Sequence, residues 1–116
     1  MDKAKRKELT NTYKRSFPSM GVFSIKNKTT GKQLIGKSTN LIGALNRHRM
    51  ELCMGVHRNQ ELMADWRLLG EAQFAFEVLE QIKERPDPDF DYPSELDRRM
   101  AFWRVKVPLG SPASYL

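Results

Sequence analysis

Apolar and polar residues are arranged over positions 21–36 in a way that predicts a β-hairpin. Two apolar groups in this stretch are formed by Val22, Phe23 and Ile25 and by Leu34 and Ile35. The polar segment 28–31 between them, Lys-Thr-Thr-Gly, contains a glycine, which adopts positive φ at little cost and is typical of turns. We therefore expect two antiparallel strands joined by this turn.

Two amphipathic helices are predicted after the hairpin, because apolar residues recur there at spacings of three and four. The first is expected over residues 41–52, after polar residues at 38–40 that can each cap a helix. Its apolar stripe consists of Leu41, Ala44, Leu45, His48 and Leu52. The second is expected over residues 60–69, with Asn59 as its N-cap and Trp66 in the core.

A third strand and a last helix complete the predicted elements. Apolar residues alternate over positions 73–80, and they occur on both faces, so we expect this strand in the centre of the sheet. Proline and aspartate are frequent over 83–93, which indicates a connector. The last helix is expected to begin at Ser94 and to end before Pro108. Its apolar stripe consists of Leu96, Met100, Trp103 and Val107.

Together these elements predict one small α+β domain, in which a three-stranded antiparallel β-sheet is flanked by helices. The domain is expected over residues 19–107. Residues 1–18 are expected to form a basic N-terminal helix or arm, and residues 108–116 a C-terminal tail. A chain of 116 residues is long enough for one modest core.

The net charge of +6 is concentrated at one end of the chain. Residues 1–18 contain six Lys or Arg and two acidic residues, whereas residues 83–116 contain six of each kind. A basic end favours a polyanionic partner such as nucleic acid, and a merely solvated arm has the same composition.

The cysteine content and the absence of long apolar runs set the expected compartment. The single cysteine, Cys53, cannot form an internal disulfide, which is typical of a reducing compartment. No apolar run approaches the ~20 residues that a membrane span needs. We therefore expect a cytoplasmic protein without a membrane partner.

The order of the predicted elements and several residues within them resemble the GIY-YIG nuclease family. The matching residues are Gly21-Val22-Phe23, Gly31-Lys32, Leu34-Ile35-Gly36, His48, Gly55, His57, Asn59, Phe74 and Phe76. The resemblance spans Met20 to Ile82 and extends toward Trp103. It implies the fold described above and, in the family, a site that cleaves phosphodiesters.

The resemblance also assigns four catalytic positions, and each of them holds a residue that lacks the required group. The two tyrosine hydroxyls that help to activate water fall on Phe23 and Leu34. The arginine that stabilises the transferring phosphate falls on Ala44, and the glutamate that holds a divalent metal falls on Met100. The family route needs a metal and a guanidinium to absorb the charge that develops at phosphorus. We therefore expect an endonuclease-like protein that has lost cleavage activity.

The two histidines are the remaining polar candidates for this site. A half-buried, hydrogen-bonded structural role is the favoured interpretation of His48, while the role of His57 stays open. Two histidines without a carboxylate at ligand spacing predict no metal site, and no cofactor is expected.

The leading hypothesis is a nucleic-acid-binding module with DNA as its partner. The expected nucleic-acid-binding residues are Lys3, Lys5, Arg6, Lys7, Lys14, Arg15, Lys37, Arg47 and Arg58. One alternative is a protein-interaction module or homodimer that uses an apolar site formed by the replaced catalytic residues. A second alternative is an active nuclease that binds a divalent metal such as Mg²⁺. Its relocated residues would be Tyr13, Tyr92, His48 or His57 as the water-activating group and Glu95 or Asp97 as the metal ligand.

Overall fold

The computed structural model describes residues 19–116, and its elements follow the predicted order. The six basic residues expected to bind nucleic acid from the N-terminal segment lie outside this range, as does Tyr13. The strands are β1 (Met20–Asn27), β2 (Gln33–Ser38) and β3 (Phe74–Ile82). The helices are α2 (Leu41–Met54), α3 (Gln60–Leu69) and α4 (Tyr92–Lys106), with a 3₁₀ turn at Glu71–Gln73.

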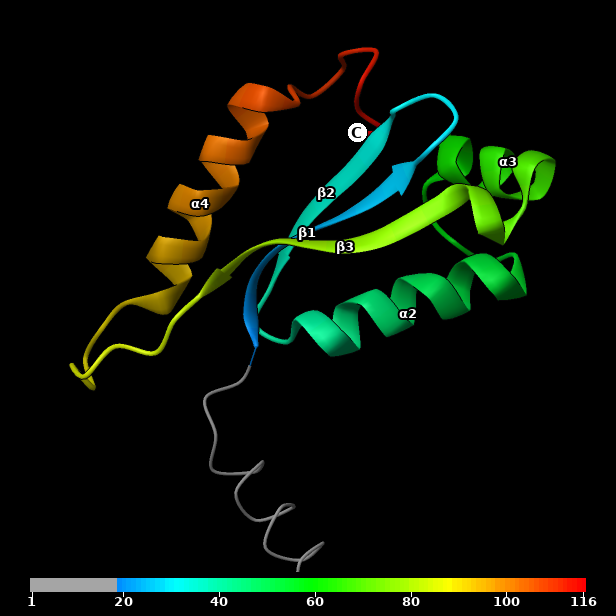
Figure 1. Cartoon of the computed structure of the whole chain (residues 1–116). Coiled ribbons are helices and arrows are strands. Elements are labelled where there is room, and N and C mark those ends of the chain that lie inside the picture. Colours follow the sequence, from blue (N-terminus) through cyan, green and yellow to red (C-terminus); the bar gives the residue numbers. More distant parts are fainter. Residues whose placement is uncertain (1–18) are drawn as a thin grey trace, which may run out of the picture.

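β1 lies in the centre of the sheet, antiparallel to β2 on one side and to β3 on the other (Figure 1). Ile25, for example, is opposite Leu34 of β2 and Phe76 of β3. The three-stranded antiparallel sheet is therefore confirmed, but the expectation of a central third strand is wrong. β3 is an edge strand that nevertheless has apolar residues on both faces, because helices cover both faces of the sheet.

Consecutive residues of one strand show how the two faces are covered. Leu34 packs in a cluster with α2 and α3, whereas its neighbour Ile35 packs with Val107 and with Met100 and Trp103 of α4. Because successive side chains of a strand point to opposite faces, α2 and α3 lie on one face and α4 on the other. Figure 1 shows this arrangement, with α4 separated from α2 and α3 by the sheet.

Side-chain caps fix where the helices begin. The Asn40 side chain accepts a hydrogen bond from the Gly43 amide at 3.0 Å, and Asn59 accepts one from Leu62 at 3.0 Å, as expected for N-caps. The last helix begins earlier than predicted, because Asp91 rather than Ser94 is its cap and accepts from the Ser94 amide. A proline in the first helical turn is tolerated, since its missing N–H has no partner there in any case.

The segment expected to be a C-terminal tail is instead packed against the domain. Tyr115 is 6% exposed and belongs to the core cluster beneath α2 and α3. Its amide donates to the Gln33 carbonyl at 2.9 Å. Its hydroxyl donates to Asp65 at 2.7 Å and accepts from Asn27 at 3.1 Å. These contacts fix the segment after α4 beside the start of β2.

Candidate functional site

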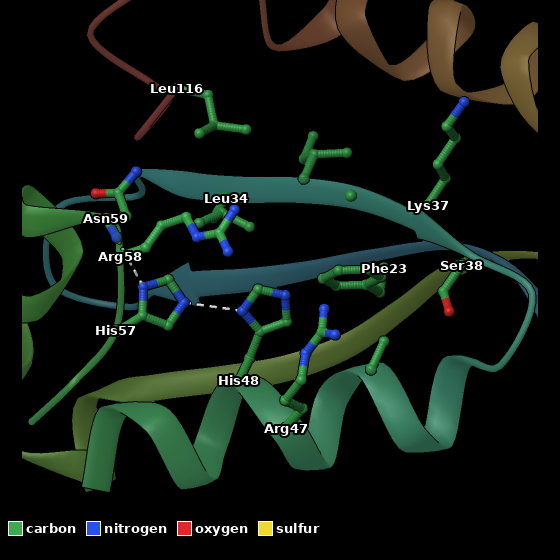
Figure 2. A pocket seen from close by; sticks show the side chains of 13 residues that line it. Phe23, Leu34, Lys37, Ser38, Arg47, His48, His57, Arg58, Asn59 and Leu116 are labelled. Atoms are coloured by element: carbon green, nitrogen blue, oxygen red, sulfur yellow. Dashed lines mark hydrogen bonds between the residues drawn. The ribbon is translucent and has the colours of Figure 1, made fainter. Parts of the chain in front are cut away.

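A cleft of about 500 Å³ lies where β1 and β2 face α2 and the loop between α2 and α3 (Figure 2). Phe23, Leu34 and Ala44 line it, so three of the four positions that the resemblance marks as catalytic are brought together. None of these side chains carries an oxygen or nitrogen atom. These three side chains therefore cannot activate water or bind phosphate.

The aromatic ring of Phe23 sits tightly in the floor of the cleft. It is 3% exposed and lies against Gly36, where an added Cβ would be 2.5 Å from Phe23 Cζ. The ring also packs against the imidazole of His48, with ring centroids 5.3 Å apart. The position of this ring therefore requires glycine at position 36.

Met100 is absent from the cleft. It packs on the opposite face of the sheet with Val22, Ile35 and Val107. A thioether in an apolar cluster does not fit a hard cation such as Mg²⁺, which takes oxygen ligands. The structure therefore offers no fit for the metal that the resemblance implies at this position.

The acidic residues considered as replacement metal ligands are engaged in ion pairs. Glu95 is 4% exposed, and its carboxylate lies 2.9 Å from Arg99 and 3.3 Å from Arg98. Asp97 pairs with Lys37 across α4 and β2. The hydroxyl of Tyr92 accepts a hydrogen bond from the Arg85 amide at 2.9 Å. None of these three residues lines the cleft.

The two histidines form a directly hydrogen-bonded pair at the cleft wall. His48 Nδ1 lies 2.8 Å from His57 Nε2 (Figure 2). The Asn59 amide donates to His57 Nδ1 at 3.0 Å, so that nitrogen carries no proton in the neutral ring. The proton of His57 is then on Nε2 and is donated to His48 Nδ1, which leaves the proton of His48 on Nε2.

Burial keeps both rings neutral. It lowers the pKa of His48 below its ordinary value of 6.5, and the neighbouring His57 and Arg47 lower it further. Burial also lowers the pKa of His57, with Glu51 opposing and Arg58 adding to the shift. Both imidazoles are therefore uncharged at neutral pH.

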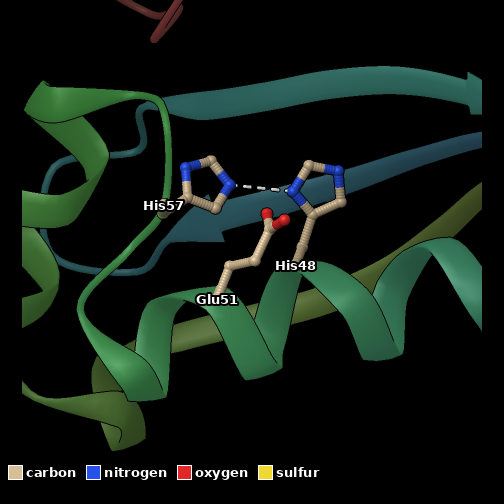
Figure 3. A group of neighbouring side chains, drawn as sticks. All are labelled: His48, Glu51 and His57. Atoms are coloured by element: carbon tan, nitrogen blue, oxygen red, sulfur yellow. Dashed lines mark hydrogen bonds between the residues drawn. The ribbon is translucent and has the colours of Figure 1, made fainter.

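A carboxylate that the sequence analysis did not consider joins the pair. Glu51 lies one helical turn after His48 on α2, and one ligand atom from each of Glu51, His48 and His57 falls within 4.8 Å of the others (Figure 3). The signal was present in the spacing of three between His48 and Glu51, which share one face of a helix. What the sequence lacked was the position of the loop that carries His57.

Three of the expected nucleic-acid-binding residues surround the cleft. Lys37, Arg47 and Arg58 all line it. Figure 2 shows Arg47 on α2 and Arg58 on the α2–α3 loop beside the cleft, whereas the Lys37 side chain extends from β2 away from it. Lys37 is paired with Asp97. Arg47 and Arg58 are exposed, and among residues 19–116 neither has a side-chain hydrogen bond or an ion pair. These two guanidinium groups are available to an anion.

Two solved structures resemble this chain. The catalytic domain of the homing endonuclease I-TevI matches with a TM-score of 0.65 and 23% identity, over 83% of this chain and 95% of that chain. A mutant catalytic domain of the intron endonuclease I-TevI matches with a TM-score of 0.60 and 23% identity, over 76% and 82%. No protein-family model and no curated protein sequence matches. The similarity confirms the expected GIY-YIG-like fold.

None of the helices in residues 19–116 has the length and apolar character needed to cross a membrane.

Proposed function

We propose that this chain is a nucleic-acid-binding module, with DNA as its partner, built on an endonuclease-like fold without the cleavage route of that fold. One observation carries the proposal. The cleft that gathers the replaced catalytic positions is apolar at Phe23, Leu34 and Ala44, yet the unpaired guanidinium groups of Arg47 and Arg58 border it.

The charges around the cleft favour a phosphate backbone. Arg47 and Arg58 can bind an anion without breaking an ion pair to another described residue. Lys37 would lose only its exposed ion pair with Asp97, which contributes little stability. Guanidinium groups match phosphate oxygens with two parallel hydrogen bonds. The neutral His48–His57 pair adds an N–H donor at His48 Nε2. The resulting site suits an anion that carries several acceptor oxygens.

The similar structures support the class of partner. Both belong to an endonuclease, and endonucleases act on nucleic acid. Binding through phosphates needs only cations in suitable places, whereas cleavage also needs groups that activate water and absorb charge. The simplest interpretation of this cleft is that it retains nucleic-acid binding and has lost cleavage.

The direct test is binding of the full chain to short single- and double-stranded DNA and RNA over a series of salt concentrations. The same samples, with and without Mg²⁺ or Mn²⁺, are analysed for cleavage. We expect binding that weakens linearly in log salt and no cleavage. Metal-dependent cleavage would overturn the loss of activity, and the absence of all binding would overturn the module itself.

A protein-binding or homodimerising function is the second candidate, and exposed apolar side chains favour it. Met54 on α2, Val56 in the loop between α2 and α3, and Leu68 on α3 are 66%, 62% and 80% exposed. The cleft itself is a weaker partner site, because Phe23 and Leu34 are only 3% and 6% exposed. Sedimentation of the free chain at increasing concentration tests self-association, and a mass that stays monomeric contradicts the homodimer.

A further inference from the structure

We propose that His48, Glu51 and His57 form a binding site for a divalent transition-metal ion such as Zn²⁺ or Co²⁺. The site is distinct from the metal position that the resemblance assigns, since Met100 lies on the other face of the sheet. Its three donors come from one helix and the loop that follows it: α2 supplies His48 and Glu51, and the loop before α3 supplies His57 (Figure 3).

The three donor atoms lie close together in the structure. The three ligand atoms lie within 4.8 Å of one another, and His48 Nδ1 and His57 Nε2 are 2.8 Å apart. A tetrahedral Zn²⁺ at about 2.0–2.2 Å from each donor would hold them roughly 3.3 Å apart. Binding therefore requires the side chains to move, and the Glu51 carboxylate ends a flexible side chain that can do so.

The chemistry of the donors selects the class of ion. An imidazole binds a metal ion in its neutral form, through the nitrogen that carries no proton. The Glu51 carboxylate has no hydrogen bond or ion pair to any other described residue. Two nitrogens and one carboxylate oxygen suit Zn²⁺ or Co²⁺, whereas Mg²⁺ and Ca²⁺ prefer oxygen alone.

Binding has a defined local cost. In the neutral ring His57 Nε2 carries the proton, so this nitrogen can bind the ion only after the proton has moved to Nδ1. A proton on Nδ1 removes the acceptor of the Asn59 amide, which is now bonded to it at 3.0 Å. Asn59 also caps α3. The Asn59 amide is therefore a reporter of metal binding that is independent of any activity.

Two nearby cationic side chains influence which ligand would take the fourth coordination position of the bound metal ion. Arg47 and Arg58 line the same small hollow of about 170 Å³ as the three donors. Their charges weaken binding of a bare cation and favour an anion, such as hydroxide or phosphate, in the open coordination position. We therefore expect weaker binding than at a closed structural zinc site, and an affinity that increases when an anion is present.

The test is a titration of the full chain with Co²⁺, followed by the visible absorption bands of the bound ion. It is done in a Cys53→Ser background, because the exposed thiol two residues after Glu51 can itself bind cobalt. We expect saturation at one equivalent, displacement by Zn²⁺, and a shift of the Asn59 amide signal in ¹H–¹⁵N NMR spectra.

Matched variants locate the ion. Glu51→Gln and His57→Gln should each weaken Co²⁺ binding at least tenfold, whereas Glu77→Gln, at an exposed position on β3, should leave it unchanged. Circular dichroism confirms that each variant is folded. The absence of a cobalt complex at millimolar metal, or a complex unaffected by Glu51→Gln, would overturn the proposal. No nucleic acid is involved, so this result is independent of the proposed function.

Discussion

Phe23 and Gly36 are in such close contact across the β1–β2 pair that only a glycine leaves room for the ring. An ideal Cβ on Gly36 would lie 2.5 Å from Cζ and 2.8 Å from Cε2 of Phe23. The two residues are also directly opposite in the strand register. The Phe23 ring, packed against Gly36, therefore forms the floor of the cleft, and the shape of the cleft depends on both residues.

Gly36→Ala should destabilise the domain by about 1–3 kcal/mol, because the new methyl group overpacks a buried ring. Urea unfolding measures this cost. The matched comparison is the same substitution in a Phe23→Leu background, where the shorter side chain leaves space and the cost should become smaller. An equal cost in both backgrounds would show that contact with the ring is not its cause.

Removal of Arg99 should be much more harmful than removal of its neighbour Arg98, although both contact Glu95. Arg99 lies 2.9 Å from the buried Glu95 carboxylate and 3.0 Å from Glu80, whereas the Arg98 side chain is 72% exposed. Arg99→Met leaves a buried carboxylate poorly compensated and should cost about 2–3 kcal/mol. Arg98→Met should cost less than about 1 kcal/mol. Similar unfolding midpoints for the two variants would contradict the account of this ion pair.

Stability should fall with pH below about 6.5 in metal-free buffer, because of the histidine pair. Burial lowers the folded-state pKa of His48 and His57 below the unfolded value of 6.5. The stability they contribute is complete above pH 6.5 and is lost as pH falls toward their folded values, since the unfolded chain then binds more protons. Urea unfolding between pH 7.5 and 5.5 measures the slope. The His48→Gln/His57→Gln variant should show a flatter profile, and an unchanged profile would contradict the assignment.

The sequence predicted most of the fold, because alternation and helical spacing are local properties. The hairpin, the two amphipathic helices and the last helix all follow from such patterns. The position of β3 at the edge did not, since apolar residues on both faces indicate only that both faces are covered. Tyr115 was missed for a related reason. A single aromatic residue in a short polar segment gives no periodic signal, and its partners Asn27 and Asp65 are distant in sequence.

The site was predicted in part. The resemblance placed Phe23, Leu34 and Ala44 at corresponding positions, and the structure brings them into one cleft. Met100 did not join them, because the face of α4 that carries it is determined by packing against Val22 and Ile35. Glu51 was not predicted as a site residue, because its place in the site depends on contact with His57. The loop between α2 and α3 brings His57 back to α2, and the sequence does not reveal the path of this loop.

The most direct measurement of the central claim is the salt dependence of DNA binding by two charge-matched variants. Arg47→Ala/Arg58→Ala removes the two unpaired cations of the cleft, and Lys28→Ala/Lys83→Ala removes two exposed cations elsewhere. Each lost phosphate contact lowers the slope of log affinity against log salt by about 0.9. The cleft variant should therefore bind more weakly than the unmodified chain, with a slope reduced by roughly 1.8, while the control variant keeps the slope of the unmodified chain. Equal slopes for the two variants would contradict a role of this cleft in binding nucleic acid.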